Sequence, residues 1–224
     1  MTLERTSEMD SPHTWNAVLL VFLGWCLGLV GPVVVDAIKK RYRNSEIRAG
    51  ILAELHELRH RIAATVFLFE TRFGTFDRKV LEWLLPILKD YRGANPSADA
   101  IETIEKMLKF TDEELAAVAK KAQAPVGGAL GIKKYAVRYL DSRLADLGGF
   151  SEKARALLLD IRNRIDLYNE EVDQIRYFFG LTYQSGISPE NHTQASQLIV
   201  SGYRNLGTQA RQIIQHIESL STTK

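Results

Sequence analysis

WNAVLLVFLGWCLGLVGPVVV, from Trp15 to Val35, is the stretch around which the rest of the chain is organised. It contains no charged side chain and a single amide, and nothing else in the chain resembles it. As a helix rising about 1.5 Å per residue it spans about 30 Å, which matches the hydrocarbon core of a bilayer. We therefore expect one transmembrane helix over residues 15–36.

The residues before this stretch distinguish an anchor from a cleaved signal peptide. A signal peptide has a positive leader, a shorter apolar core and a cleavage site between small residues. Here Glu4, Glu8 and Asp10 oppose a single Arg5, and the apolar run is longer. The pattern favours a signal anchor. The other alternative, a buried core helix, would not need a basic cluster directly after the run.

Basic residues flank the span unequally, which predicts its orientation. Lys39, Lys40, Arg41 and Arg43 follow it, whereas only Arg5 precedes it. Basic residues beside a span stay on the cytoplasmic side. We expect a short extracytoplasmic tail over 1–14 and a cytoplasmic domain over 37–224, in an inner or plasma membrane. The four basic residues are also expected to contact anionic lipid headgroups.

Three glycines lie within the predicted span. Gly24 and Gly28 have the GxxxG spacing, and Gly31 lies about one turn further along the same side. Glycines four apart allow two membrane helices to approach closely. These residues are candidates for self-association, although glycine is also common in membrane helices with no such role.

Composition limits the remaining classes. The 224 residues are 46% hydrophobic and 25% charged with a net charge of +2, so no strong field attracts nucleic acid. Cys26 is the single cysteine, which excludes an intramolecular disulfide and a cysteine zinc cluster. About 180 residues follow the span, enough for one domain with its own core.

Apolar spacing predicts that this domain is an all-α bundle. A long juxtamembrane helix is expected over 45–73, with apolar residues in steps of four and three. Shorter helices are expected within 78–147, including 132–147, with Asp77 as one N-cap and a capping box at Thr111. The juxtamembrane stripe comprises Ile47, Ile51, Leu55, Leu58, Ile62, Val66, Phe69 and Phe73.

The last third, 151–221, predicts a long antiparallel helical hairpin. Ser151 is the expected N-cap of the first helix, and Ser188 followed by Pro189 marks the start of the second. The first helix has the heptad seam of a coiled coil. The two predicted seams are Ala154, Leu158, Ile161, Ile165, Tyr168, Val172, Ile175 and Phe179, and then Ala195, Ile199, Tyr203, Leu206, Ala210, Ile213, Ile217 and Leu220.

One motif suggests chemistry. His56-Glu57-Leu58-Arg59-His60 resembles the H-E-x-x-H signature of zincin metalloproteases and lies on a predicted helix. The resemblance covers five residues and implies that His56 and His60 bind zinc while Glu57 acts as general base. A third ligand is required, for which Glu82 is the candidate. Arg59 and Arg61 disfavour a nearby cation, and the alternative is a polar shoulder of an amphipathic helix.

A glycine-rich loop at 123–131 precedes Lys133 and Lys134 but does not match a P-loop. No strand precedes it, and no serine or threonine follows the lysines. Lys133, Lys134, Arg138 and Arg143 instead form a modest basic face, either solvated or facing lipid headgroups or an acidic partner.

These patterns favour a non-catalytic scaffold, sensor or assembly module with one membrane span and no cofactor. It would act through a protein partner or as a homo-oligomer, without nucleic acid. Two alternatives stay open: a membrane-associated zinc metalloprotease, and an effector that oligomerises in the membrane.

Overall fold

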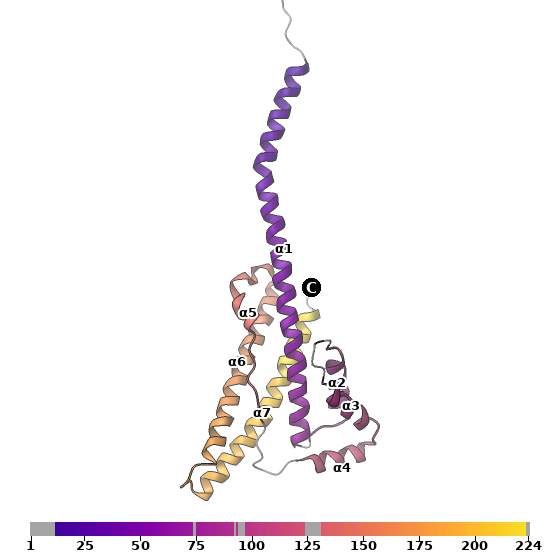
Figure 1. Cartoon of the computed structure of the whole chain (residues 1–224), viewed down its shortest axis with the longest axis vertical. Helices are drawn as coiled ribbons and strands as arrows, with labels where there is room; N and C mark the ends of the chain where they lie inside the picture. Colours follow the sequence, from indigo (N-terminus) through magenta and orange to yellow (C-terminus); the bar gives the residue numbers. More distant parts are fainter. Residues whose placement is uncertain (1–11, 74, 92, 94–96, 124–130, 223–224) are drawn as a thin grey trace, which may run out of the picture. The chain divides into compact units, whose positions relative to one another are not determined.

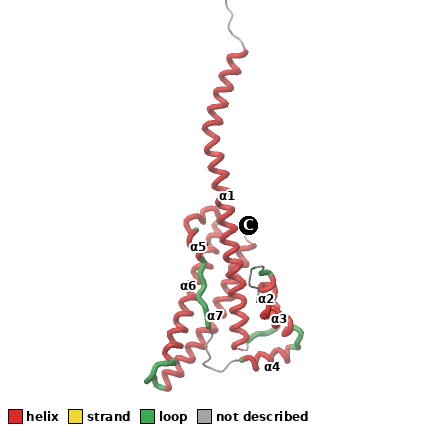
Figure 2. Tube along the Cα trace, in the orientation of Figure 1, coloured by secondary structure: helices red, strands yellow, loops and turns green. Residues whose placement is uncertain are grey.

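The chain is all-helical. The computed structural model describes residues 12–73, 75–91, 93, 97–123 and 131–222. It is 85% helical, and no strand occurs in these ranges (Figure 2). This confirms the all-α class. Of the predicted extracytoplasmic tail, residues 1–11 lie outside the described residues, as do residues 124–130 of the predicted glycine-rich loop.

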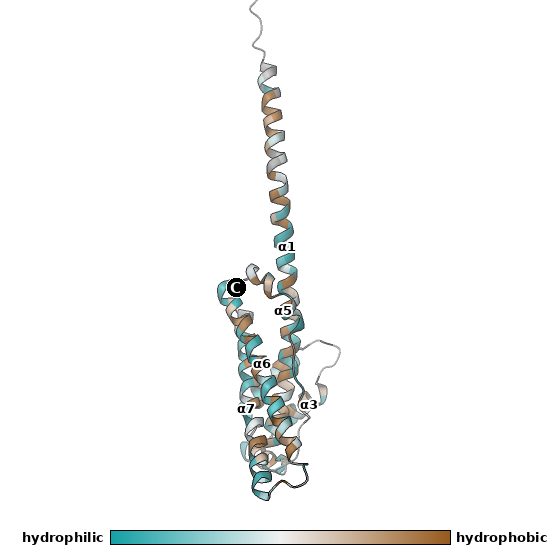
Figure 3. Ribbon diagram, turned by 90° about the vertical axis from the view of Figure 1, so that its left-hand side faces the viewer, coloured by the Kyte–Doolittle hydropathy of each residue, from teal (hydrophilic) through white to brown (hydrophobic). Residues whose placement is uncertain are grey.

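The first helix, α1 (Pro12–Phe73), contains the apolar stretch. Tertiary contacts divide the chain into two units, Met1–Ile47 and Arg48–Lys224. In the first unit the described large apolar side chains from Trp15 to Tyr42 are exposed, including Trp15 at 73% and Val21 at 74%, whereas Ile47 at its end is buried. Figure 3 colours much of this part of α1 brown. Among the described residues, α1 is the one helix long and apolar enough to span a membrane.

The second unit contains the remaining helices, and the N-caps predicted at Asp77, Thr111 and Ser151 are confirmed. Asp77 accepts from the backbone N–H of Val80 at 2.8 Å, Thr111 forms the capping box, and Ser151 accepts from Ala154 at 3.3 Å. The elements are α2 (Arg78–Lys89), α3 (Ala98–Met107), α4 (Asp112–Ala122), α5 (Arg138–Ser142), the 3₁₀ helix η1 (Leu144–Gly149), α6 (Glu152–Leu181) and α7 (Pro189–Thr222).

The core of the second unit is built from the predicted apolar stripes. From Ile51 to Phe69 every stripe residue of α1 is at most 5% exposed. The α6 seam is buried from Ala154 to Ile175, and the whole α7 seam is buried. Burying a large aliphatic side chain stabilises the fold by about 1.5–3 kcal/mol, so this buried apolar surface is the main contribution to the stability of the second unit.

Helices α6 and α7 pack along each other in opposite directions (Figure 1). Arg164 Nη1 of α6 donates to Gln212 Oε1 of α7 at 2.7 Å. Asp160 lies one turn before Arg164, and its Oδ2 is 2.8 Å from Nε2 of His216, which lies one turn after Gln212, as expected for antiparallel helices. Gly202 allows a close approach of α7 to α6, because a Cβ there would lie 2.6 Å from Cγ1 of Ile175.

The helix predicted over 132–147 is wrong in its first part. Residues 132–137 are not helical, and α5 begins only at Arg138. The Asn169 side chain accepts from the N–H of Tyr135 at 2.9 Å and donates to its carbonyl at 2.7 Å. The Glu54 carboxylate accepts from the N–H groups of Tyr139 and Leu140. Side chains distant in sequence thus bind the amides that a helix would pair internally.

Candidate functional site

The predicted zinc motif lies on α1 in the second unit, where its members contact three different neighbours. His56 Nε2 is 3.9 Å from Asp90 Oδ2, and Glu57 pairs with Arg61 one turn along the same helix. Leu58 belongs to the core at 5% exposure. The glutamate expected to act as a general base is therefore held in an ion pair within α1.

His60 is buried, although the alternative to zinc binding placed it on the polar shoulder of an amphipathic helix. It is 5% exposed, and its ring stacks on Tyr91 with centroids 4.0 Å apart. Ser97 Oγ is 3.2 Å from its Nε2, while its Nδ1 is buried without a hydrogen-bond partner. Burial lowers the pKa of His60, and the neighbouring His56 and Arg61 lower it further. The imidazole is therefore neutral at pH 7.

These positions do not assemble a zinc site. Among the described residues, no three His, Cys, Asp or Glu side chains are grouped so that they could hold a metal ion. Glu82, the candidate third ligand, is exposed on α2. Zinc needs at least three protein ligands in a tetrahedral arrangement, and His60 already faces Ser97 with its Nε2. The residues present do not fit the ion.

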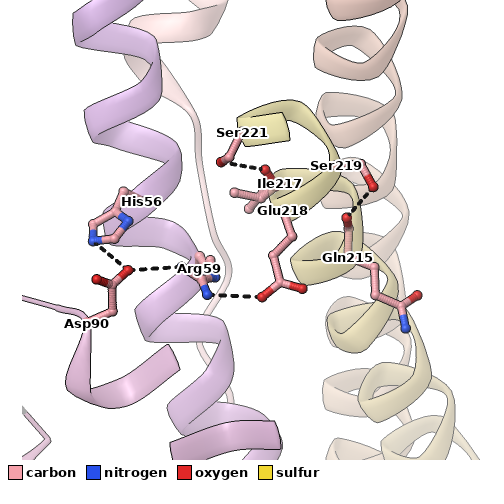
Figure 4. Close-up of polar contacts among 8 residues, drawn as sticks. All are labelled: His56, Arg59, Asp90, Gln215, Ile217, Glu218, Ser219 and Ser221. Carbon is pink, nitrogen blue, oxygen red and sulfur yellow. Dashed lines mark hydrogen bonds and ion pairs between the residues drawn. The ribbon is translucent and has the colours of Figure 1, made fainter. Parts of the chain in front are cut away.

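Arg59, which the motif leaves unspecified, is the residue that connects the helices (Figure 4). Its Nη1 donates to Asp90 Oδ2 at 3.3 Å, and its Nη2 donates to Glu218 Oε1 at 3.0 Å. Asp90 is the C-cap of α2 and Glu218 lies on α7, so one guanidinium joins three helices. We call the set His56, Arg59, His60, Asp90 and Glu218 the α1 node.

No local sequence signal identifies the residues that contact Arg59 and His60 in the α1 node. Asp90 and Ser97 follow Arg59 and His60 by 31 and 37 residues, and Glu218 follows Arg59 by 159. The sequence places two histidines and an arginine on one turn of α1, but only the tertiary structure brings Tyr91 and Glu218 to them.

A cavity of about 440 Å³ adjoins the node. Its lining residues include three cations, two tyrosines and a serine, and no carboxylate. The lining consists of His60, Arg61, Ala64, Tyr91, Ser97, Lys133, Lys134 and Tyr135. We call it the node cavity. A second cavity, of about 450 Å³, shares Arg61, Lys134 and Tyr135 with it and is also lined by Glu54, Glu57 and Arg138.

One wall of the node cavity is the extended segment 132–137. Besides its Asn169 contacts, Tyr135 has its hydroxyl 2.5 Å from Thr65 Oγ1 on α1. Arg176 of α6 donates to the carbonyl of Ile132 at 2.7 Å. The segment is therefore held at Ile132 and at Tyr135, although it has no regular secondary structure.

The other predicted site residues lie in the first unit. A Cβ placed on Gly24, Gly28 or Gly31 would meet nothing within 4 Å, so this face of the helix is open. The side chains of Lys39, Lys40, Arg41 and Arg43 are exposed. These positions are compatible with helix association and with headgroup contacts, and both stay predictions.

Comparisons with known proteins give no relative. No family model matches the chain, and neither a curated protein nor a solved structure matches it.

Proposed function

We propose that the chain is a single-pass membrane anchor with a cytoplasmic helical domain that binds a protein partner or a second copy of itself, without catalysis. The observation that carries this proposal is the exposed apolar surface of the first unit. Val18, Leu20, Phe22 and Trp25 are each more than half exposed on one helix. Each such side chain gains about 1.5–3 kcal/mol when it leaves water completely.

A bilayer is the partner that suits this surface best. A helix satisfies its own backbone hydrogen bonds, so it can enter hydrocarbon without cost from unpaired amides. The side chains are exposed all round the helix rather than along one stripe, which is typical of a span and not of an amphipathic helix on a core.

The orientation follows from the charges that flank the span. Lys39, Lys40 and Arg41 hold the C-terminal side in the cytoplasm by the positive-inside rule, and the N-terminal tail lies outside. Anionic headgroups add about 1 kcal/mol of attraction per basic residue near the surface.

A binding role for the domain is supported by how it uses its polar residues. Arg59 joins α1 to α2 and α7, and His60 packs under Tyr91. The motif that suggested a protease thus stabilises helix packing. The long antiparallel pair α6 and α7, the predicted helical hairpin, offers an exposed outer face for a partner. No specific observation favours the zinc protease or the oligomerising effector.

Topology tests the proposal. The full chain is expressed in cells, and membranes are washed at alkaline pH to remove peripheral proteins. We expect the protein to stay in the membrane pellet, and protease added outside intact cells to leave everything beyond Val35 uncut until lysis. Recovery in the soluble fraction, or cleavage of the domain in intact cells, would overturn the proposal.

Self-association has its own test, based on the glycine face. Gly28→Leu fills the open face, whereas Val30→Leu changes a residue about half a turn away from it and serves as the matched control. If the span mediates association, Gly28→Leu lowers the oligomer mass in mild detergent and Val30→Leu does not. Equal masses for both variants and the wild type would remove the span from the association mechanism.

A further inference from the structure

We propose that the node cavity binds a phosphate monoester, with Arg61, Lys133 and Lys134 as the groups that recognise it. The proposal concerns the second unit alone and goes beyond the membrane-anchored binding role. The same chemistry is present in a water-soluble phosphate ester and in the headgroup of phosphatidic acid, and the experiment below separates these two sources.

The charge of the cavity lining points to an anion. Three cations and no carboxylate line it. Arg61 pairs with Glu57 and Lys134 pairs with Asp173, but all four side chains are 43–63% exposed, and neither carboxylate lines the node cavity. Lys133 is exposed and has no acidic partner among the described residues. Like charges gathered in one concave site repel each other, and a bound dianion relieves that repulsion.

The neutral groups of the lining suit phosphate oxygens rather than a metal or an apolar ligand. Lysine and arginine form charge-assisted hydrogen bonds with phosphate, and the hydroxyls of Ser97 and Tyr91 can donate to the remaining oxygens. The field is felt by His60 as well, whose pKa is lowered in part by Arg61. A divalent cation would meet the same three positive charges and be repelled.

The site is also preorganised. Lys133 and Lys134 lie on the extended segment, which Asn169, Arg176 and Thr65 hold in place. A volume of about 440 Å³ falls within the range of small-molecule sites, so a phosphate and a small organic group fit together. Ordering costs on binding are therefore low, because the backbone that carries the two lysines is already fixed.

The test uses the full chain in nanodiscs of phosphatidylcholine, titrated calorimetrically with glycerol 3-phosphate. We expect saturable binding at millimolar concentration or below, weakening as salt rises. Lys133→Gln should weaken binding about tenfold, the effect of losing one charge-assisted hydrogen bond. Lys133→Arg should retain binding. Lys153→Gln, an exposed lysine on α6 outside the cavity, is the matched control and should bind like the wild type.

Discs that also contain phosphatidic acid identify the source. If the headgroup is the ligand, glycerol 3-phosphate no longer binds in these discs, and Lys133→Gln reduces association with discs containing phosphatidic acid. If a soluble ester is the ligand, its affinity is unchanged. Either result supports the proposal. Absence of saturable binding in both kinds of disc, or equal weakening by Lys133→Gln and Lys153→Gln, overturns it and leaves the membrane-anchoring proposal untouched.

Discussion

Two touching tyrosines in the second unit should respond oppositely to the same substitution. Tyr168 of α6 is fully buried, and its hydroxyl has no hydrogen-bond partner. Tyr135, whose ring centroid is 5.5 Å away, places its hydroxyl 2.5 Å from Thr65 Oγ1 and 3.3 Å from the carbonyl of Arg61. Tyr168→Phe should raise the free energy of unfolding, and Tyr135→Phe should lower it.

The magnitudes follow from what each hydroxyl loses on folding. A buried hydroxyl without a partner costs about 1–3 kcal/mol in protein mutational data, so Tyr168→Phe recovers about 1 kcal/mol after allowing for the small void left behind. Burial also raises the pKa of Tyr168 far above its usual value, so this phenol is neutral throughout the accessible pH range. Tyr135→Phe removes a made hydrogen bond worth about 1 kcal/mol, with Thr65 still donating to the Arg61 carbonyl at 3.1 Å.

Thermal unfolding of the full chain in mild detergent, followed by circular dichroism, measures both effects. For a unit of this size 1 kcal/mol corresponds to about 2–4 °C in Tm. We expect the midpoint to rise in Tyr168→Phe and to fall in Tyr135→Phe. A Tyr168→Phe variant less stable than the wild type would refute the reasoning, because the hydroxyl would then have a partner that stabilises the fold.

Three further outcomes are expected. Gly202→Ala should lower Tm, because the added Cβ would lie 2.6 Å from Cγ1 of Ile175. Gly207→Ala should raise Tm, because its Cβ would make an ordinary contact of 3.8 Å with Phe69 and alanine favours the helix by about 1 kcal/mol over glycine. The lowered pKa of His60 means that its contribution to stability is fully present above pH 6.5 and is lost as the pH falls below that value, where the unfolded chain binds the proton more readily. His60→Phe should therefore flatten the acid side of a stability–pH profile, by at most about 1.4 kcal/mol per pH unit, whereas exposed His192→Gln should not. Elemental analysis of purified protein should find zinc well below one per chain and no difference in His56→Ala, and stoichiometric zinc that His56→Ala removes would contradict the account of the motif.

Local sequence was sufficient to predict the long helices and the surfaces that they bury. The stripe from Ile51 to Phe69 could be predicted because one face of a long helix must be apolar wherever it packs on a core. The cap at Thr111 could be predicted because its partner, Glu114, is three residues away. Both signals are complete within a few turns of chain.

The segment 132–137 could not be predicted, because what determines it lies elsewhere. Its residues carry no helix breaker after Gly131, and apolar spacing favoured a helix. Asn169 of α6 accepts from the amide of Tyr135 within the segment, and Glu54 of α1 accepts from the amide of Tyr139 just after it. A buried or half-buried amide needs only one good acceptor, and neither the pattern nor the propensity of a segment shows when a distant side chain provides it.

The zinc motif is a second case in which residues distant in sequence decide the outcome. Its spacing correctly places two histidines and two arginines on adjacent turns of one helix, but the chemistry depends on what faces them. A carboxylate in contact with both imidazoles would make the turn a metal site, whereas Tyr91 and Ser97 against His60 make it a packing contact. The same register aims Arg61 into a cavity whose other charges, Lys133 and Lys134, come from 72 and 73 residues later in the chain. A helix turn whose spacing resembles a cation site therefore adjoins a cavity that we propose binds an anion, and the sign of the ligand is decided by residues outside the motif.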